Sequence, residues 1–287
     1  MDIHDRLNLS HDLYKALSGI KYPSNAQEPD YIAQLVKDLP GIIKASLSAL
    51  FPARQISVGG AFIHQKPIVH FINRAGFKDP ELGDLLLVCR EKRSMGDVYN
   101  AMLLQAKVTD SPMCAHIPID HQFILYSEWP EFQYKRAGSL NGKTRSILPK
   151  TITQGAQYLL IDRISPNDML TASVNNPLNG SRVFAFTIAS ILSFEEGRTF
   201  QFNNPRDDWS QMILDLLRTS AASTFNRRRS GHIAAKRWSG DLAFSFILNP
   251  EEPDNEALDL LKFHDDENEE AISGISVICI DLGTSTN

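Results

Sequence analysis

The chain has 287 residues, of which 43% are hydrophobic and 22% are charged, a composition typical of a globular protein with one large or two small domains. No run of residues is long and apolar enough for a membrane span, and the N-terminal residues lack the apolar segment of a signal peptide. We therefore expect a cytoplasmic protein with no membrane partner. The three cysteines are scattered and odd in number, which argues against a disulfide framework and against a zinc site. Because the net charge is −5, a surface that binds nucleic acid would need a local concentration of basic residues.

Two helices are predicted before the first strand. Apolar residues recur at helical spacing from Leu7 to Leu17, and a loop rich in Pro, Ser, Asn and Gln follows at 23–29. A second helical pattern then runs to Leu50, with Asp30 as its expected N-cap and Pro40-Gly41 as a kink or break.

The segment 56–72 is rich in β-branched and aromatic residues and predicts a strand or a pair of strands. A polar cluster, His64-Gln65-Lys66, interrupts it. We interpret this cluster as a turn between two strands, and a contact with phosphate is the alternative.

The segment from Glu81 to Val108 predicts a long β-hairpin, because two apolar runs flank a polar turn that contains glycine. Asp84 opens the first run, and Gln105 and Lys107 close the second. Since side chains alternate along a strand, Gln105 and Lys107 must point to one face and Ala106 to the other. If the hairpin pairs in the obvious register, Asp84 joins Gln105 and Lys107.

An acid, an amide and a lysine at the ends of apolar strands are costly to bury unless they serve a purpose. A divalent metal with a bound phosphate would use all three. A carboxylate is a hard oxygen ligand, an amide carbonyl is a weaker one, and a lysine can pair with a phosphate oxygen or an attacking water.

Asp84 followed by Gln105-Ala106-Lys107 resembles the signature of the restriction-endonuclease-like nucleases, the PD-(D/E)XK superfamily, in which an aspartate precedes (Asp/Glu/Gln)-x-Lys. The Gln form is most similar to the Mrr-type branch. The resemblance extends from the helix before the hairpin to the helix after it. It departs from the commoner pattern at Gln105, which removes one negative charge from the metal site. The resemblance implies an α/β fold with a mixed central β-sheet flanked by helices.

The same resemblance implies metal-dependent hydrolysis of phosphodiester bonds in nucleic acid, with DNA as the expected substrate and defence against foreign DNA as the expected role. Mg²⁺ or Mn²⁺ would be held by Asp84, the Gln105 side-chain carbonyl and the Ala106 backbone carbonyl, and Lys107 would orient the attacking water. Glu81 is the candidate to hold a second ion. The family's preceding helix sometimes donates a further carboxylate; Glu28, Asp30 and Asp38 are candidates, although a capping or solvated role is favoured for each.

After the hairpin, a helix is predicted from His121, capped by Asp120 and stopped by Pro130. Gln122, in its first turn, could contact a phosphate or a metal-bound water, but a solvated side chain is the favoured interpretation. The segment 134–150 is polar and has little periodicity, so it predicts a solvated loop. As a loop that faces substrate, it would offer Lys143 and Arg145 to phosphates.

The remaining chain alternates strands and helices. Strands are predicted at 158–164, 242–248 and 275–282, a strand or short buried helix at 181–191, and a helix from Trp209 to Phe225 capped by Asp207-Asp208. The helix runs into a basic cluster that either balances the helix dipole or binds phosphate. This cluster consists of Arg227, Arg228, Arg229, Lys236 and Arg237.

We predict a single domain over residues 1–287, with a nuclease-like core at about 30–165 and a C-terminal α/β extension at about 166–287. The alternative function is a catalytically inactive nucleic-acid-binding or regulatory subunit with the same fold. A third interpretation is an enzyme that acts on another phosphate ester or on a nucleotide, because a fold alone does not fix the substrate. A homodimer or a place in a larger complex fits either function.

Overall fold

The computed structural model describes residues 1–63, 67–74, 76–222 and 274–285. In chain order the described helices and strands are α1 (Ile3–Leu17), α2 (Glu28–Leu50), β1 (Arg54–Ala61), β2 (Ile68–Phe71), β3 (Leu85–Glu91), β4 (Val98–Thr109), α3 (His121–Glu128), β5 (Phe132–Lys135), a 3₁₀ turn η1 (Gly138–Leu140), β6 (Thr144–Arg145), β7 (Ala156–Asp162), β8 (Leu170–Ala172), β9 (Arg182–Val183), α4 (Phe184–Leu192), β10 (Arg198–Thr199), α5 (Asp208–Ala222) and β11 (Ser276–Ser285).

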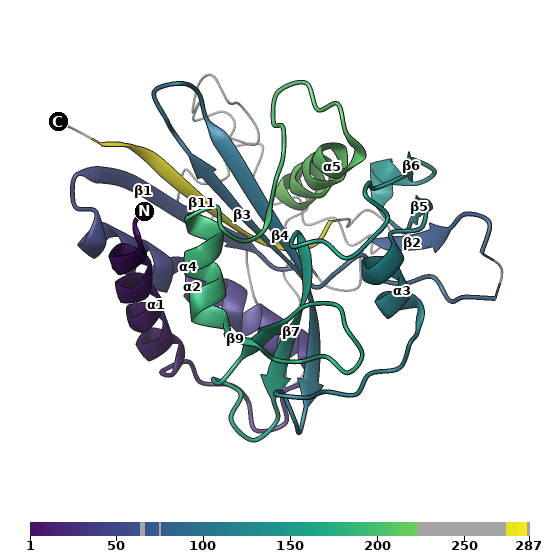
Figure 1. Ribbon diagram of the computed structural model, residues 1–287, viewed down its shortest axis with the longest axis horizontal. Coiled ribbons are helices and arrows are strands. Elements are labelled where there is room, and N and C mark those ends of the chain that lie inside the picture. The colour runs from purple at the N-terminus through teal and green to yellow at the C-terminus, as the bar shows by residue number, and fades with distance from the viewer. Residues whose placement is uncertain (64–66, 75, 223–273, 286–287) are drawn as a thin grey trace.

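A mixed central sheet organises the molecule. Within the described residues it has eight strands in the order β1-β11-β3-β4-β7-β8-β9, and β10 pairs with the beginning of β4. Side chains from alternate strand positions enter two hydrophobic cores, one with α1, α2 and α4 and the other with α3, α5 and a small second sheet (Figure 1). The predicted fold class, a mixed sheet flanked by helices, is therefore confirmed.

The predicted hairpin is the centre of this sheet. Strands β3 and β4 pair antiparallel, with Leu85 opposite Leu104 and Glu91 opposite Val98. The strand predicted at 158–164 is β7, which pairs parallel with the second half of β4. The hairpin is thus flanked on both sides, which explains its nearly continuous apolar runs.

The last strand, β11, lies between β1 and β3, antiparallel to the first and parallel to the second. The sequence correctly predicted a strand here, but it placed this strand in a C-terminal extension and not inside the central sheet. A boundary near residue 165 does not divide this sheet, because residues 276–285 are integral to the core that we assigned to 30–165.

Helix α2 begins three residues earlier than an N-cap at Asp30 predicts, at Glu28, and continues through Pro40 to Leu50 without a break. Gln27 is the N-cap, whereas Asp30 lies in the first turn and its side chain accepts a 3.0 Å hydrogen bond from the Gln27 N–H. The N-cap assigned to Asp30 was therefore wrong. As a result, Glu28 becomes the first residue of a helix whose N-terminus points at the end of β4.

Helix α3 follows its predicted bounds. The Asp120 side chain accepts hydrogen bonds from the N–H groups of Gln122 and Phe123, at 3.0 and 3.1 Å. Trp129 then takes the left-handed conformation at the C-cap, immediately before Pro130. In the described part of the chain, no helix is both long enough and apolar enough to cross a membrane.

The segment 134–150 is not a solvated loop. Strand β5 pairs with β2 on one side and with β6 on the other, which makes a second sheet of three strands. Phe132 and Tyr134 are buried, while Gln133 and Lys135 between and beyond them are not. The prediction was wrong because this alternation is short and sits among polar residues.

The sequence left either a strand or a short buried helix open at 181–191, and the structure decides between them. The segment 181–191 is mainly the helix α4, preceded by the short edge strand β9. Helix α5 begins at Asp208, and the Asp207 side chain caps it by accepting a 2.9 Å hydrogen bond from the Ser210 N–H. The strand predicted at 242–248 and the end of the helix predicted to Phe225 lie outside the described residues.

Candidate active site

The hairpin places Asp84 beside Gln105 through its register. One step beyond the pair Leu85–Leu104, the Asp84 N–H donates a 2.9 Å hydrogen bond to the Leu104 carbonyl. Ala106 is packed in the core shared by α1, α2 and α4, while Leu103 belongs to the opposite core. Alternation therefore directs Gln105 and Lys107 to the face opposite Ala106, as the sequence predicts.

The carboxylate of Asp84 is tied to β4 through one oxygen. Its Oδ2 accepts hydrogen bonds from Gln105 Nε2 and from the Ala106 N–H, the latter at 2.7 Å. Among the described residues, no hydrogen bond engages Oδ1 of Asp84. One carboxylate oxygen is thus fixed by the protein, and the other is available to a ligand.

Lys107 lies next to the N-terminus of α2. Its Nζ is 3.7 Å from Glu28 Oε2, and Glu28 Oε1 accepts a 3.2 Å hydrogen bond from the Val108 N–H. Glu28 is thus bound to β4 at Lys107 and at the residue after it, and its charge is also favoured at the N-terminus of a helix. The sequence favoured a capping or solvated role for Glu28; the structure instead places it against Lys107. Asp30 accepts a hydrogen bond from the Gln27 N–H, and Asp38 accepts one from the Gln34 side chain.

The charge of this site is unbalanced. Burial, together with the negative charges of Glu81 and Glu28, raises the pKa of Asp84 to about 7, although the Ala106 N–H and Lys107 act in the opposite direction. Burial and Glu28 also raise the pKa of Glu81, against the effect of Lys107. Among the described residues, three carboxylates therefore share the ammonium group of Lys107, and a further positive charge would stabilise this set of charges.

Close packing fixes the start of β3. A Cβ on Gly83 would lie 2.7 Å from Tyr126 Oη, and that hydroxyl donates a 2.8 Å hydrogen bond to the Leu82 carbonyl. Tyr158, the partner of Gln105 on β7, is fully buried, and its hydroxyl finds no hydrogen-bond partner among the described residues. These two tyrosines were not among the predicted site residues, because each belongs to an ordinary apolar pattern.

A small cavity opens beside Asp84, between the start of α2 and the end of β1. It is lined by Pro29, Ile32, Phe62, Ile63, Gly83 and Ser276 in addition to Asp84. The side chain of Asp84 therefore adjoins the space outside the sheet as well as the strand β4.

The donor atoms fit a hard divalent cation. Within the described residues, no three His, Cys, Asp or Glu side chains are close enough to form a metal site by themselves. Mg²⁺, however, is commonly held by one or two carboxylates together with waters and substrate phosphates. Asp84 Oδ1 and the Ala106 carbonyl offer oxygen ligands, and rotation of the Gln105 amide exchanges its Nε2 for Oε1 and adds a third.

The other predicted contact residues do not join this cluster. Gln122 lies in the first turn of α3, and no described contact connects its side chain to Asp84. Arg145 and Lys143 both approach Asp215 on α5, at 2.5 and 3.8 Å. The predicted basic cluster of Arg227, Arg228, Arg229, Lys236 and Arg237 lies outside the described residues. Phosphate binding by all of these side chains stays a prediction.

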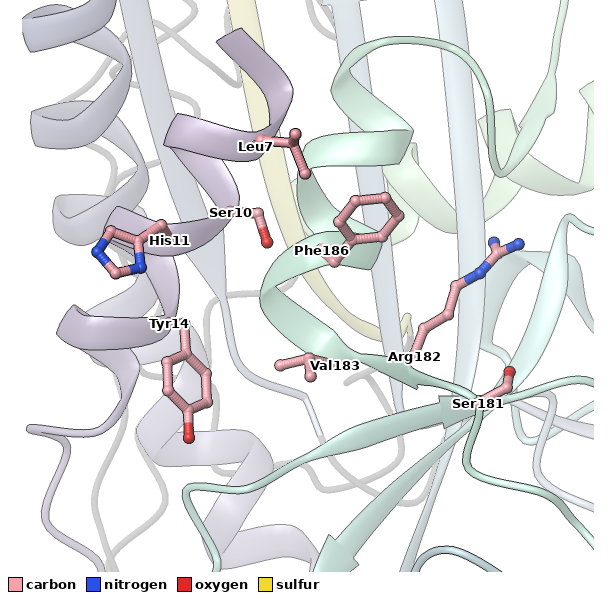
Figure 2. A pocket seen from close by; sticks show the side chains of 8 residues that line it. All are labelled: Leu7, Ser10, His11, Tyr14, Ser181, Arg182, Val183 and Phe186. Atoms are coloured by element: carbon pink, nitrogen blue, oxygen red, sulfur yellow. The ribbon is translucent and has the colours of Figure 1, made fainter. Parts of the chain in front are cut away.

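A larger cavity lies elsewhere in the described part of the protein. It is a groove of about 550 Å³ between α1 and the β9–α4 segment, with His11, Tyr14, Arg182 and Phe186 among its lining residues (Figure 2). It shares no residue with the site around Asp84. Arg182 is ion-paired with Glu196, and Tyr14 Oη donates a 3.0 Å hydrogen bond to Asp168.

Comparisons of the chain with family models, with curated proteins and with solved structures found no match. The fold and the site geometry, together with the resemblance of Asp84 and Gln105-Ala106-Lys107 to a nuclease signature, are therefore the basis for a functional assignment.

Proposed function

We propose that this protein is a metal-dependent nuclease that hydrolyses phosphodiester bonds, with DNA as its substrate. One observation carries the proposal: Asp84 and Gln105 meet at the end of a central hairpin, and Lys107 follows on the same face, paired with Glu28. An acid, an amide and an amine in this arrangement match what hydrolysis of a phosphodiester requires.

The metal ligands in this proposal are Asp84, the side-chain oxygen of Gln105 and the backbone carbonyl of Ala106. When bound, Mg²⁺ or Mn²⁺ would supply polarisation of the phosphate and a lower pKa for a coordinated water. The excess negative charge of Asp84, Glu81 and Glu28 supports a cation here, since it contributes to the raised pKa of Asp84.

Lys107 has two tasks in the proposed reaction. It orients the attacking water, and its charge offsets the negative charge that develops on the phosphate oxygens. Glu28 is a positioning residue, because its carboxylate lies 3.7 Å from the Lys107 ammonium group and limits where that group can point. Glu81, whose charge acts on the same cluster, is the candidate to hold a second ion.

A specific observation favours a second candidate, an inactive nucleic-acid-binding or regulatory subunit with the same fold. The uncharged Gln105 stands where a second carboxylate would strengthen metal binding, and its amide donates to the same Asp84 oxygen as the Ala106 N–H. One oxygen of Asp84 is therefore already satisfied by the protein without a metal. This candidate predicts nucleic-acid binding without cleavage.

A titration with Mg²⁺ and with Mn²⁺ on supercoiled plasmid DNA separates the two candidates. The nuclease proposal expects nicked and linear products that require the metal and disappear with a chelator. If no product forms at any concentration of either metal while the protein still binds DNA, the inactive subunit is the better assignment. A cytoplasmic role in defence against foreign DNA, as a homodimer or within a larger complex, is part of the proposal and requires tests in cells.

A further inference from the structure

The small sheet of β2, β5 and β6 has one apolar and one polar face. Val69, Phe71, Phe132 and Tyr134 are buried beneath it. Because paired residues point to the same side, His70, Gln133 and Thr144 form a row across the three strands on the opposite, outer face, with Lys135 next to it. This alternation also explains Arg145, which is opposite Phe132 and so points inward to Asp215.

The chain that builds this sheet is strongly basic. Residues 67–80 and 131–150 contain seven Lys or Arg and two acidic residues, a net charge of +5 in a protein whose net charge is −5. Four of these cations have acidic partners: Arg74 pairs with Glu128, Lys135 with Asp79, and Lys143 and Arg145 with Asp215. The remaining three are exposed, and no ion pair within the described residues engages them: Lys78, Arg136 and Lys150.

The outer face is connected directly to the candidate active site. Ile68 on β2 pairs with Lys135 on one side and forms an isolated bridge with Glu81 on the other. Two further backbone hydrogen bonds of 2.9 Å, Val69 N–H to Pro80 O and Leu82 N–H to Pro67 O, hold β2 to the chain that leads into Asp84. At about 4.8 Å between neighbouring strands, Lys135 and Glu81 are about 10 Å apart along the backbone pairing direction.

We propose that four cations of the segments that build this sheet, Lys78, Lys135, Arg136 and Lys150, together form a basic face that binds the sugar-phosphate backbone of duplex DNA next to the candidate active site. The inference rests on the proposed function for its substrate and adds the surface that holds it. A separation of about 10 Å equals roughly three steps of 3.4 Å along a duplex, so cations here would contact phosphates near the bond placed at Asp84.

Chemistry favours a duplex over a single strand. Proteins that bind single strands stack the bases on aromatic side chains, whereas backbone contacts with a duplex need only cations and polar groups. The outer face of β2, β5 and β6 presents His70, Gln133, Lys135 and Thr144, with no Phe, Tyr or Trp among the outward positions of these strands. Contacts of this kind position DNA without reading its sequence.

The test compares two triple variants of equal charge in an Asp84→Asn background, which separates binding from cleavage. The basic-face variant carries Lys78→Gln, Arg136→Gln and Lys150→Gln. The control carries Lys15→Gln, Lys21→Gln and Lys37→Gln, all exposed and on α1, on α2 or between these helices, outside the segments that build the small sheet. Figure 1 shows α1 on the side of the molecule opposite β2, β5 and β6. Binding of a fluorescent DNA duplex is measured by anisotropy over a range of salt concentrations, and circular dichroism verifies that both variants are folded.

We expect the basic-face variant to bind at least about tenfold more weakly than its parent. The slope of log affinity against log salt should fall by roughly three, since each phosphate that a cation neutralises contributes about 0.9 to that slope. The control should keep the affinity and slope of its parent within about twofold. Equal weakening of both variants, no change in either, or tighter binding to anionic phospholipid vesicles than to the duplex would overturn the proposal.

Cleavage of plasmid DNA by the chain with native Asp84, with and without the basic-face substitutions, distinguishes this inference from the proposed function. Loss of duplex binding in a protein that never cleaves would support the basic face and reject the nuclease. Cleavage that continues in the basic-face variant, with unchanged duplex affinity, would support the nuclease and reject the basic face.

Discussion

The two ends of the β3–β4 hairpin differ in how their charged side chains are balanced. At the end where β3 finishes, three arginines face three carboxylates: Arg90 bonds to Asp281 at 2.5 Å and lies 3.8 Å from Asp97, while Arg54 and Arg93 bond to Glu91 at 2.9 and 2.7 Å. At the end where β3 begins, Asp84, Glu81 and Glu28 share Lys107. We call these the arginine end and the site end.

The titration of each end reflects this difference. At the arginine end, burial opposes the charges of Arg90 and Glu91, but their ionic hydrogen bonds outweigh it, so the pKa of Arg90 is raised and that of Glu91 is lowered. At the site end, burial and repulsion act together, and the pKa values of Asp84 and Glu81 are both raised. A balanced cluster of this kind stabilises a sheet, whereas an unbalanced one is typical of a functional site.

The two ends of the hairpin should differ most in how their substitutions affect DNA cleavage. Lys107→Ala and Asp84→Ala should each lower DNA cleavage by roughly 10²- to 10³-fold or more, because each removes a charge that acts on the reacting phosphate or its metal. Arg93→Ala, an exposed change at the arginine end, is the matched control and should leave cleavage unaffected. Cleavage at the normal rate by purified Lys107→Ala or Asp84→Ala would reject the assignment.

Removal of a charge from the arginine end should unfold the protein more easily. Asp281→Asn leaves the buried Arg90 without its bidentate partner, so we expect a loss of roughly 3–5 kcal/mol in the free energy of unfolding. Urea denaturation measures this. The double change Arg90→Met with Asp281→Leu removes both charges and should recover a large part of the loss; a double variant as unstable as the single one would show that packing, not charge, is responsible.

Removal of the Asp84 charge from the site end should instead raise the free energy of unfolding. The pKa of Asp84 rises from 3.8 to about 7 on folding, so the folded state binds the extra proton between these pH values and stability falls as the pH rises through them. Asp84→Asn should therefore stabilise the protein by up to about 4 kcal/mol at pH 8 and by little at pH 4.

Mg²⁺ should also change the thermal stability of the wild-type protein more than that of Asp84→Asn. At pH 8 it should raise the melting temperature of the wild-type protein, whose site carries the excess negative charge, and change that of Asp84→Asn much less. Thermal unfolding with and without Mg²⁺ at both pH values measures these effects. If Asp84→Asn is less stable than wild type at pH 8, the charge at this position is compensated in a way that the site geometry does not reveal.

The site end was predictable from sequence because its parts are local. The hairpin brings Asp84 and Gln105 together through one turn, and the alternation of strand residues decides which side chains share a face. Glu28 was only weakly predictable, since an acid in the first turn of a helix caps or complements the helix dipole far more often than it reaches another element. Its contact with Lys107 depends on how α2 crosses the sheet.

The arginine end was not predictable, because it depends on a strand almost two hundred residues away in sequence: Asp281 is 191 positions from Arg90. An apolar run such as 275–282 predicts a strand but contains no information about its neighbours in the sheet. The small sheet of β2, β5 and β6 was not predicted for a different reason. Its two buried aromatic positions on β5, Phe132 and Tyr134, are too few to reveal a period of two among polar residues.

A smaller effect is expected at the glycine that precedes Asp84. Gly83→Ala would place a methyl group 2.7 Å from Tyr126 Oη and 2.8 Å from Leu103 Cδ1, so the start of β3 must shift. We expect a loss of about 1–3 kcal/mol in the free energy of unfolding and weaker cleavage. The double variant Gly83→Ala with Tyr126→Phe removes the closest clash and should restore part of both; no recovery of either would mean that Leu103 or the backbone sets the limit.

The smallest effect on stability is expected for Glu28, which separates a positioning role from a structural one. The Glu28–Lys107 pair is partly exposed and 3.7 Å long, so Glu28→Gln should change the free energy of unfolding by less than about 1 kcal/mol. The same change removes a negative charge from the site and releases the Lys107 ammonium group. We therefore expect cleavage to need a higher Mg²⁺ concentration and the maximal rate to fall, while Glu28→Asp recovers part of the metal dependence. Unchanged metal dependence in Glu28→Gln would contradict a role for Glu28 at the metal and restrict it to its contact with the Val108 N–H.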